Sequence, residues 1–339
     1  NAKGRKKAAV GISPRVPAIH EMVTGEPYDD IYADKTFLFG TDAGVVHAIR
    51  GINLDLQKGE TVAIVGESGS GKSVTMKAAV GLLDSNATIN SGEILYTYDD
   101  GHGQDKTVDL LKLSKKQLRT EYNGQRLAMV FQDPMASLNP RKKVGDIISE
   151  GMDIHHRFAN RQEREEKISE MLKKVGLSPE HAARYPHQFS GGQRQRVGIA
   201  RALIMNPKLI IADECISALD VSIQAQVINL LHDLQERMGL TYLFIAHDLN
   251  IVKYISDRIA VMYLGALVEM APAEELMRNP LHPYTKALLS AVPFADPVAS
   301  RARRRIKLEG EVPSPIAIQG GCKFQTRCPH CTSMLEEKK

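Results

Sequence analysis

The sequence predicts an α/β fold built on a largely parallel sheet. The prediction depends on three short apolar runs, at residues 61–65, 209–212 and 241–246. Runs that are apolar throughout are typical of strands buried on both faces of a parallel sheet. Helical patterns of apolar residues separate these runs, and such alternation is typical of α/β domains. Further strands are expected at residues 45–56, 92–98 and 259–263, and a helical region from about residue 134 to 189.

Composition narrows the class of protein. The chain has 339 residues, of which 43% are hydrophobic and 25% charged, as expected of a globular protein with about two domains. Its longest apolar stretch, residues 259–268, is shorter than the ~20 residues that a membrane-spanning helix needs. A net charge of +4 is too small to predict a nucleic-acid partner. The first 33 residues show no clear period and are expected to lie outside the fold.

The most specific local pattern is GESGSGKS at residues 66–73, which matches G-x-x-x-x-G-K-[S/T]. In such a loop the backbone N–H groups wrap phosphate oxygens, and glycine permits the necessary turns. Lys72 is expected to reach the β- and γ-phosphates of a nucleotide, and the Ser73 hydroxyl to ligate Mg²⁺. The residues predicted to bind the nucleotide are Gly66, Ser68, Gly69, Ser70, Gly71, Lys72 and Ser73.

Polar residues follow the other two apolar runs. Asp213 and Glu214 follow residues 209–212, and His247 follows residues 241–246. Because ligands bind at the carboxyl ends of parallel strands, all three are expected near the nucleotide. We predict that Asp213 holds Mg²⁺ through water and that Glu214 polarises the attacking water. His247 is expected to contact the γ-phosphate, although a lone histidine is more often structural.

A second glycine-rich segment, FSGGQRQR at residues 189–196, lies far downstream of the first. One nucleotide pocket needs one phosphate cradle. The second segment therefore indicates that the chain completes a site on another subunit.

Together these motifs make the chain resemble the ATP-binding subunits of ATP-binding-cassette (ABC) transporters from about residue 39 to 331. The resemblance implies a P-loop NTPase core with a mainly parallel sheet, an antiparallel β subdomain, a helical subdomain and a small C-terminal extension. Gln132 matches the glutamine loop, Asp220 in SALD the D-loop and His247 the switch residue. The family signature corresponds to Ser190, Gly191, Gly192 and Gln193, preceded by Phe189 where leucine is commoner.

In that family two subunits enclose two ATP molecules head to tail, each between one phosphate loop and the other subunit's signature. The signature here is thus expected to cap the γ-phosphate of a partner's ATP, at the start of a helix. The resemblance also implies that Gln132 senses Mg²⁺ and that Asp220 belongs to the catalytic machinery. Adenine is expected to stack on Phe39, with Phe37 and Tyr32 as alternatives.

One position departs from the family pattern. Cys215 follows the catalytic glutamate where proline is commoner, which frees a backbone N–H and a φ angle. We expect Cys215 to be a buried, inert thiol rather than a reactive one. We nevertheless expect the chain to hydrolyse ATP, because the glutamate of the family pattern is present as Glu214.

The C-terminal segments narrow the resemblance to the ATPases of oligopeptide and dipeptide importers. Residues 279–293, 308–316 and 321–329 are similar to the extension found in that subfamily. The implied partners are a second, homologous ATPase subunit, two membrane permeases and an extracytoplasmic peptide-binding protein, with this chain on the cytoplasmic face of the membrane. Nickel, glutathione or a sugar oligomer are alternative cargoes. A non-transport ATPase acting on DNA or ribosomes is a remote alternative.

The resemblance also divides the chain into regions. Residues 1–33 are expected to form an N-terminal extension, residues 34–278 the nucleotide-binding domain, and residues 279–339 the C-terminal extension. The helical subdomain is placed at about residues 134–190.

Three cysteines, Cys322, Cys328 and Cys331, cluster in the C-terminal extension. Clustered thiols in a reducing compartment indicate metal or iron–sulfur ligation more than disulfides. Some relatives bind a four-iron, four-sulfur cluster through four such cysteines, so this cluster is the leading expectation, with free thiols or zinc as alternatives. A further family cysteine falls here at Leu335.

Overall fold

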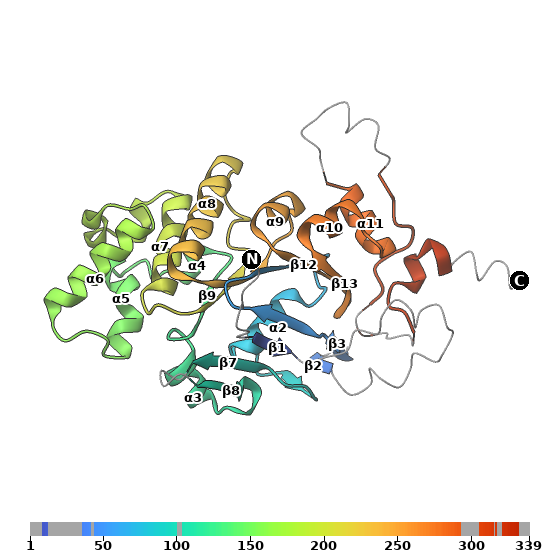
Figure 1. Ribbon diagram of the computed structural model, residues 1–339, viewed down its shortest axis with the longest axis horizontal. Coiled ribbons are helices and arrows are strands. Elements are labelled where there is room, and N and C mark those ends of the chain that lie inside the picture. Colours follow the sequence, from blue (N-terminus) through green and yellow to red (C-terminus); the bar gives the residue numbers. More distant parts are fainter. Residues whose placement is uncertain are drawn as a thin grey trace, which may run out of the picture. The chain divides into compact units, whose positions relative to one another are not determined.

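The structure is a computed structural model that describes residues 9–12, 36–41, 44–99, 104–292, 305–314, 316 and 321–331 (Figure 1). The chain divides into two compact units. The first unit contains residues 1–8, 56–62 and 112–246. The second unit contains residues 9–55, 63–111 and 247–339.

The sheet of the first unit is parallel. β10 (Leu209–Asp213) lies between β9 (Leu127–Val130) and β11 (Thr241–Ile245), and both pairings are parallel. Every residue of β10 and β11 is buried, which explains why most residues of both strands are apolar. The register pairs Asp213 with Ile245, so the carboxyl ends of β10 and β11 lie side by side. The predicted α/β class with a parallel sheet is confirmed.

Helices occupy the stretch between β9 and β10. α5, α6 and α7 contact one another in the first unit and gather beside α8 (Figure 1). Between β9 and β10 lie α4 (Pro134–Ser137), α5 (Val144–Ile154), α6 (Arg161–Lys174), η3 (Pro179–Ala183), η4 (Pro186–Gln188) and α7 (Gly191–Leu203). The first unit also contains α3 (Lys115–Gln117) and η2 (Leu118–Tyr122) before β9, and α8 (Val221–Met238) after β10.

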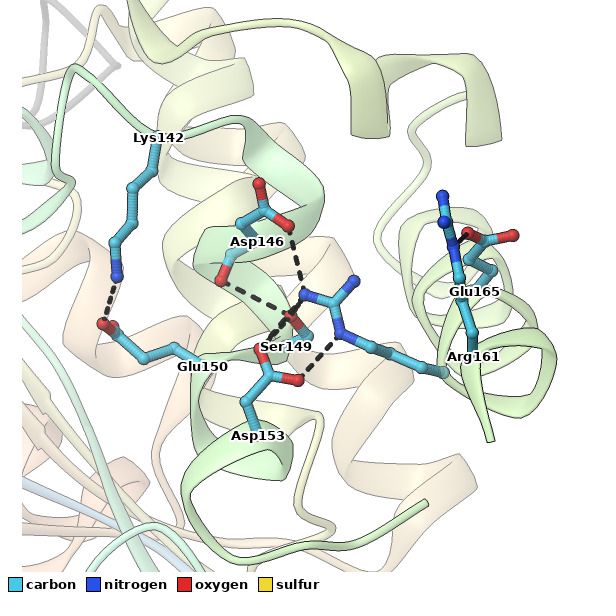
Figure 2. Close-up of polar contacts among 8 residues, drawn as sticks. Lys142, Asp146, Ser149, Glu150, Asp153, Arg161 and Glu165 are labelled. Carbon is cyan, nitrogen blue, oxygen red and sulfur yellow. Dashed lines mark hydrogen bonds and ion pairs between the residues drawn. The ribbon is translucent and has the colours of Figure 1, made fainter. Parts of the chain in front are cut away.

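A polar network joins α5 to α6. The Nε atom of Arg164 donates to Asp153 Oδ1 at 2.8 Å, and its Nη2 atom donates to Asp146 Oδ1 at 3.1 Å and to Ser149 Oγ at 2.6 Å. Figure 2 shows Asp146, Ser149 and Asp153 on the same side of α5. Three side chains of one helix therefore hold one arginine of the next.

The second unit is rich in antiparallel strands. β2 (Thr36–Thr41) pairs with β3 (Gly44–Arg50) and β6 (Ala87–Ile89), while β7 (Leu95–Asp99) pairs with β1 (Ala9–Ile12) and β8 (Asp105–Asp109). A further antiparallel pair joins β12 (Arg258–Tyr263) to β13 (Ala266–Pro272). The expected antiparallel subdomain is therefore present. The helices of this unit are α2 (Lys72–Ala79), η1 (Leu110–Lys112), α9 (Leu249–Ile255), α10 (Ala273–Arg278), α11 (Pro283–Ser290) and η5 (Gln325–Arg327).

The strand predicted at residues 45–56 is two strands, β3 and β4 (Leu54–Gln57). Gly51 separates them with a φ of 69°, a left-handed conformation that ends regular pairing. The prediction for residues 61–65 matches β5 (Thr61–Val65), which is buried throughout.

Most of the N-terminal extension predicted at residues 1–33 lies outside the described residues, and its described part, β1, pairs with β7. Within the described ranges, every helix is too short or too polar to cross a membrane.

Candidate nucleotide-binding site

The predicted phosphate loop lies between β5 and α2 in the second unit. Gly66, Gly69 and Gly71 adopt positive φ angles of 151°, 79° and 95°. A Cβ atom on Gly66 would lie 2.1 Å from the carbonyl oxygen of Met262, and one on Gly71 would lie 2.5 Å from that of Ala48. Glycine is therefore required at positions 66 and 71, because the φ angles are positive and neighbouring carbonyl groups leave no room for a Cβ atom.

Lys72 is folded over this loop. Its Nζ atom donates to the carbonyl oxygens of Gly66 at 2.8 Å and Glu67 at 3.0 Å, and the residue is buried. The Ser70 hydroxyl is also buried and has no hydrogen-bond partner among the described residues. α2 begins after Gly71 without a side-chain cap, so its first N–H groups remain suited to an anion. An ammonium group, a buried hydroxyl and a helix N-terminus together fit the phosphates of a nucleotide.

Asp213 and Glu214 form the acidic end of β10 in the first unit. Asp213 is the last residue of the strand and is buried, and Glu214 follows with a φ of 46°. The Glu214 N–H donates to the carbonyl of Ile245 at 3.1 Å, and its own carbonyl accepts from the Ser217 N–H and hydroxyl. These bonds hold a left-handed conformation that is uncommon outside glycine and is concentrated at functional sites.

Gln132 reaches the carboxylate of Glu214. Its Nε2 atom donates to Glu214 Oε2 at 2.8 Å. Two residues that the sequence predicted for one site are thus in direct contact within the first unit. Because the amide nitrogen faces Glu214, the amide oxygen is left to ligate a metal.

Oxygen ligands suited to Mg²⁺ are present at the predicted positions. They are the hydroxyl of Ser73, the amide oxygen of Gln132 and the carboxylate of Asp213. Hard oxygen donors are those that Mg²⁺ prefers, commonly with water and substrate phosphates completing the shell. Each predicted ligand therefore has the chemistry that Mg²⁺ prefers.

The signature segment begins α7. Ser190 Oγ accepts from the Gln193 N–H at 3.3 Å, while Gln193 Oε1 accepts from the Ser190 N–H at 3.1 Å. This reciprocal pair is a capping box, which orders the first turn. A Cβ atom on Gly192 would lie 2.4 Å from Cγ2 of Ile223 in α8, whereas one on Gly191 would make only an ordinary contact, at 3.5 Å from Leu219. Glycine at position 192 therefore lets α7 approach α8.

Asp220 caps α8. Its Oδ1 atom accepts from the Ile223 N–H at 3.0 Å and from the Ser222 hydroxyl at 2.8 Å. The hydrogen bond from the Ile223 N–H, followed by that from Ser222, lowers the pKa of the Asp220 carboxyl. The structure gives this predicted catalytic residue a helix-capping role.

His247 and Phe39 belong to the second unit, as does the phosphate loop. His247 is exposed and lies directly before Asp248, whose side chain caps α9. Phe39 lies in β2, opposite Val46 and Ala87. The side chains of Phe39 and Phe37, and the whole of Tyr32, lie outside the described part of the structure. The adenine contact stays a prediction.

The C-terminal cysteines do not fit the expected cluster. Within the described ranges, no group of three or more histidine, cysteine, aspartate or glutamate side chains is arranged to hold a metal ion. A four-iron cluster is commonly held by four cysteines, and the segment has three. The iron–sulfur prediction is therefore not supported.

Cys215 is buried, as predicted. Burial raises the pKa of its thiol to about 12, so the side chain is protonated at neutral pH and unsuited to nucleophilic attack. Burial and a protonated thiol both support the expectation that Cys215 is inert.

Two residues that the sequence did not single out contact the phosphate loop. The Glu67 N–H donates to Oη of Tyr284 at 2.8 Å, and Arg327 Nη1 lies 3.1 Å from Glu67 Oε2. Both belong to the C-terminal extension. The unmatched charge of Glu67 inside an anion-binding loop was the only signal in the sequence that a cationic partner was needed.

Two family models match the chain. The ABC transporter model matches residues 49–217, and the model for the C-terminal region of oligopeptide/dipeptide transporters matches residues 268–334. The first covers the phosphate loop, the signature and the acidic end of β10. The second covers most of the predicted C-terminal extension.

Several curated proteins are similar over most of their length. The oligopeptide transport ATP-binding protein OppF of Bacillus subtilis is 54% identical, covering 81% of this chain and 85% of that protein. AppF of the same organism, also named an oligopeptide transport ATP-binding protein, is 52% identical over 90% of this chain and 88% of AppF. OppF of Escherichia coli is 51% identical and covers 83% and 80%.

Solved structures with the same fold include two ATP-binding cassettes. The dimeric cassette MJ0796 in a post-hydrolysis state bound to ADP and Pi is 29% identical, with a TM-score of 0.60, covering 71% of this chain and 97% of that one. CbiO1 of Clostridium perfringens, part of the ABC transporter complex CbiONQ, is 28% identical, with a TM-score of 0.59. The match covers 73% of this chain and 91% of CbiO1.

Proposed function

Since the chain belongs to the ATP-binding subunits of ABC transporters, within their oligopeptide-transport branch, we propose that it hydrolyses ATP to drive uptake of oligopeptides or dipeptides through a membrane permease. The observation that carries this proposal is the phosphate loop, with Lys72 buried over it and the buried Ser70 hydroxyl unpaired among the residues that the structure describes. The peptide cargo depends on the similarity of residues 268–334 to peptide transporters.

From the described contacts we infer roles for individual residues. Lys72 and the N-terminus of α2 bind the β- and γ-phosphates, and the glycines let the backbone follow them. Ser73, Gln132 and Asp213 would hold Mg²⁺, which neutralises phosphate charge when bound. Glu214 orients and polarises the attacking water, and the amide of Gln132 holds its carboxylate in place. His247 contacts the γ-phosphate, Asp220 orders the turn before α8 and Phe39 stacks on adenine.

The second glycine-rich segment supports our proposal of a partner ATPase subunit. Ser190, Gly191, Gly192 and Gln193 open α7, and the N-terminus of a helix is suited to bind an anion. We infer that this segment caps the ATP held by a second, homologous ATPase subunit. The complete assembly adds two permease subunits and an extracytoplasmic peptide-binding protein, with this chain attached peripherally at the cytoplasmic face.

Reconstitution tests the function. The chain should co-purify with two hydrophobic permease subunits, and peptide-loaded binding protein should stimulate ATP hydrolysis by the complex in liposomes. Nickel, glutathione and oligosaccharides serve as control cargoes. Stimulation by one of these in place of peptides would replace the peptide assignment, and co-purification with ribosomes or DNA instead of permeases would refute transport.

A further inference from the structure

Glu67, the second residue of the phosphate loop, is held at three points. Its N–H donates to Tyr284 Oη at 2.8 Å, and its carboxylate accepts from Arg327 Nη1 at 3.1 and 3.3 Å. Its carbonyl oxygen accepts from Lys72 Nζ at 3.0 Å. Two of these three points of contact are with the C-terminal extension, and Arg327 lies 260 residues from Glu67 in the sequence.

An aromatic cluster fixes the groups that reach Glu67. Phe324, Tyr263 and Tyr284 are buried, with ring centroids 4.7 to 5.6 Å apart. The Arg327 guanidinium lies 5.9 Å from the centroid of Tyr263, and its Nη1 atom donates to the Tyr263 hydroxyl at 3.5 Å. Such rings gain from edge-on packing and from a cation over their face. The C-terminal segment is thereby attached to β12 and α11.

The loop is also supported from β12 and the turn that follows it. The Gly265 N–H donates to the carbonyl oxygen of Ser70 at 3.0 Å, and the carbonyl of Met262 occupies the space beside Gly66. The same strand carries Tyr263. The phosphate loop, β12 and the C-terminal extension are therefore one connected structure within the second unit.

We propose that the C-terminal extension positions the phosphate loop for ATP, with Arg327 and Tyr284 acting through Glu67. Lys72, which binds the phosphates in our proposal, donates a hydrogen bond to the Glu67 carbonyl oxygen. A shift of Glu67 would therefore also displace the Lys72 ammonium group. Arg327 also neutralises a carboxylate that would otherwise repel the nucleotide from within its own binding loop. Because the Arg327 side chain is only 9% exposed, water would compensate poorly for the loss of its positive charge.

Nucleotide binding by the full-length chain, assembled with its partner subunits, tests this role. Arg327→Met is expected to raise the Kd for Mg-ATP about tenfold, within the range of coupling between contacting residues. Tyr284→Phe, which removes one hydroxyl and keeps the ring, should raise the Kd by a smaller factor. The KM for ATP should rise with the Kd, while kcat changes less, because neither residue touches the reacting atoms.

The decisive variant removes the repelling carboxylate. If Arg327 acts through Glu67, Glu67→Gln combined with Arg327→Met should bind ATP more tightly than Arg327→Met alone. Arg305→Met is the matched control, since Arg305 is an exposed arginine of the same extension and is expected to leave the Kd unchanged. Thermal unfolding of each variant separates a loss of folding from a loss of positioning.

Three results would overturn the proposal. The first is a wild-type Kd for ATP in Arg327→Met. The second is a Glu67→Gln/Arg327→Met double variant that binds ATP no more tightly than Arg327→Met alone. The third is an Arg305→Met variant whose affinity for ATP falls as much as that of Arg327→Met. If Arg327→Met does not fold, Tyr284→Phe decides in its place, and wild-type affinity in that variant refutes positioning. The inference depends on ATP binding at this loop and not on the peptide cargo. Wild-type protein that binds no ATP would refute the ATPase assignment together with this inference, whereas wild-type binding with unaffected variants refutes the inference alone.

Discussion

At the scale of single residues, Glu214 combines the properties required of a group that orients water. It follows a buried strand, its backbone is held in a left-handed conformation, and the amide of Gln132 bonds its carboxylate at 2.8 Å. Strained conformations persist where neighbouring bonds enforce them. The carboxylate is therefore directed by its surroundings rather than free to rotate.

Replacing this carboxylate with an amide tests its role. Glu214→Gln keeps the size of the side chain and removes its negative charge, so ATP should still bind while turnover falls by about 100-fold or more. Phosphate release and the Kd for ATP measure the two effects separately. Glu236→Gln, on the exposed face of α8, is the control and should hydrolyse ATP normally. Normal turnover in Glu214→Gln would exclude it as the residue that activates water.

At the scale of elements, α5 and α6 depend on a charged network. Arg164 of α6 bonds Asp146, Ser149 and Asp153 of α5, which lie together in Figure 2. The hydrogen bonds from Arg164 lower the pKa of Asp153, although burial opposes them. These two helices therefore owe part of their contact to an ionised aspartate.

This network predicts a pH dependence of stability. A carboxyl whose pKa is lowered by folding stabilises the protein fully above its ordinary value of 3.8 and loses that contribution as the pH falls through the lower folded value. Asp153→Asn should flatten the dependence of the unfolding temperature on pH in this acidic range. Arg161→Met, which breaks an exposed pair with Glu165, should leave it unchanged. Equal curves for wild type and Asp153→Asn would contradict the expectation.

At the scale of the whole molecule, the two glycine-rich segments belong to different units and serve different nucleotides in our proposal. The phosphate loop is in the second unit, and the signature that opens α7 is in the first. In that proposal the signature acts on the ATP of a partner subunit, so that activity would belong to an assembly rather than to one chain. Loss of the signature should then be visible only in the assembly.

The corresponding prediction concerns Ser190. Ser190→Ala should lower ATP turnover of the assembled transporter by about tenfold or more, because an anion-binding group is lost at the partner's nucleotide. ATP binding by the isolated chain should be unaffected. Since Ser190 also caps α7, Asn160→Ala, which removes the cap of α6, controls for lost stability. Weaker ATP binding by the isolated Ser190→Ala chain would show that the segment serves the chain's own site.

Local patterns explain which parts of this architecture could be predicted. β5 matches its prediction because a strand buried on both faces must be apolar at every position. β8, with the sequence DKTVD, was missed because its residues are mostly exposed and only its pairing with β7 makes it a strand. Gly51 broke a predicted strand because a single left-handed residue ends pairing without changing the apolar pattern around it.

The sequence by itself determined the phosphate loop, the acidic end of β10 and the capped start of α7. In each case neighbouring residues supply both the backbone conformation and the chemistry. Only the tertiary structure decided that Gln132 bonds Glu214, that the C-terminal cysteines form no metal-binding group among the described residues, and that Arg327 reaches the phosphate loop. Such contacts join residues far apart in the chain, and their geometry depends on how the intervening strands and helices pack. The proposed ATP site could thus be identified from local sequence, whereas the contacts that the C-terminal extension makes with the phosphate loop could not.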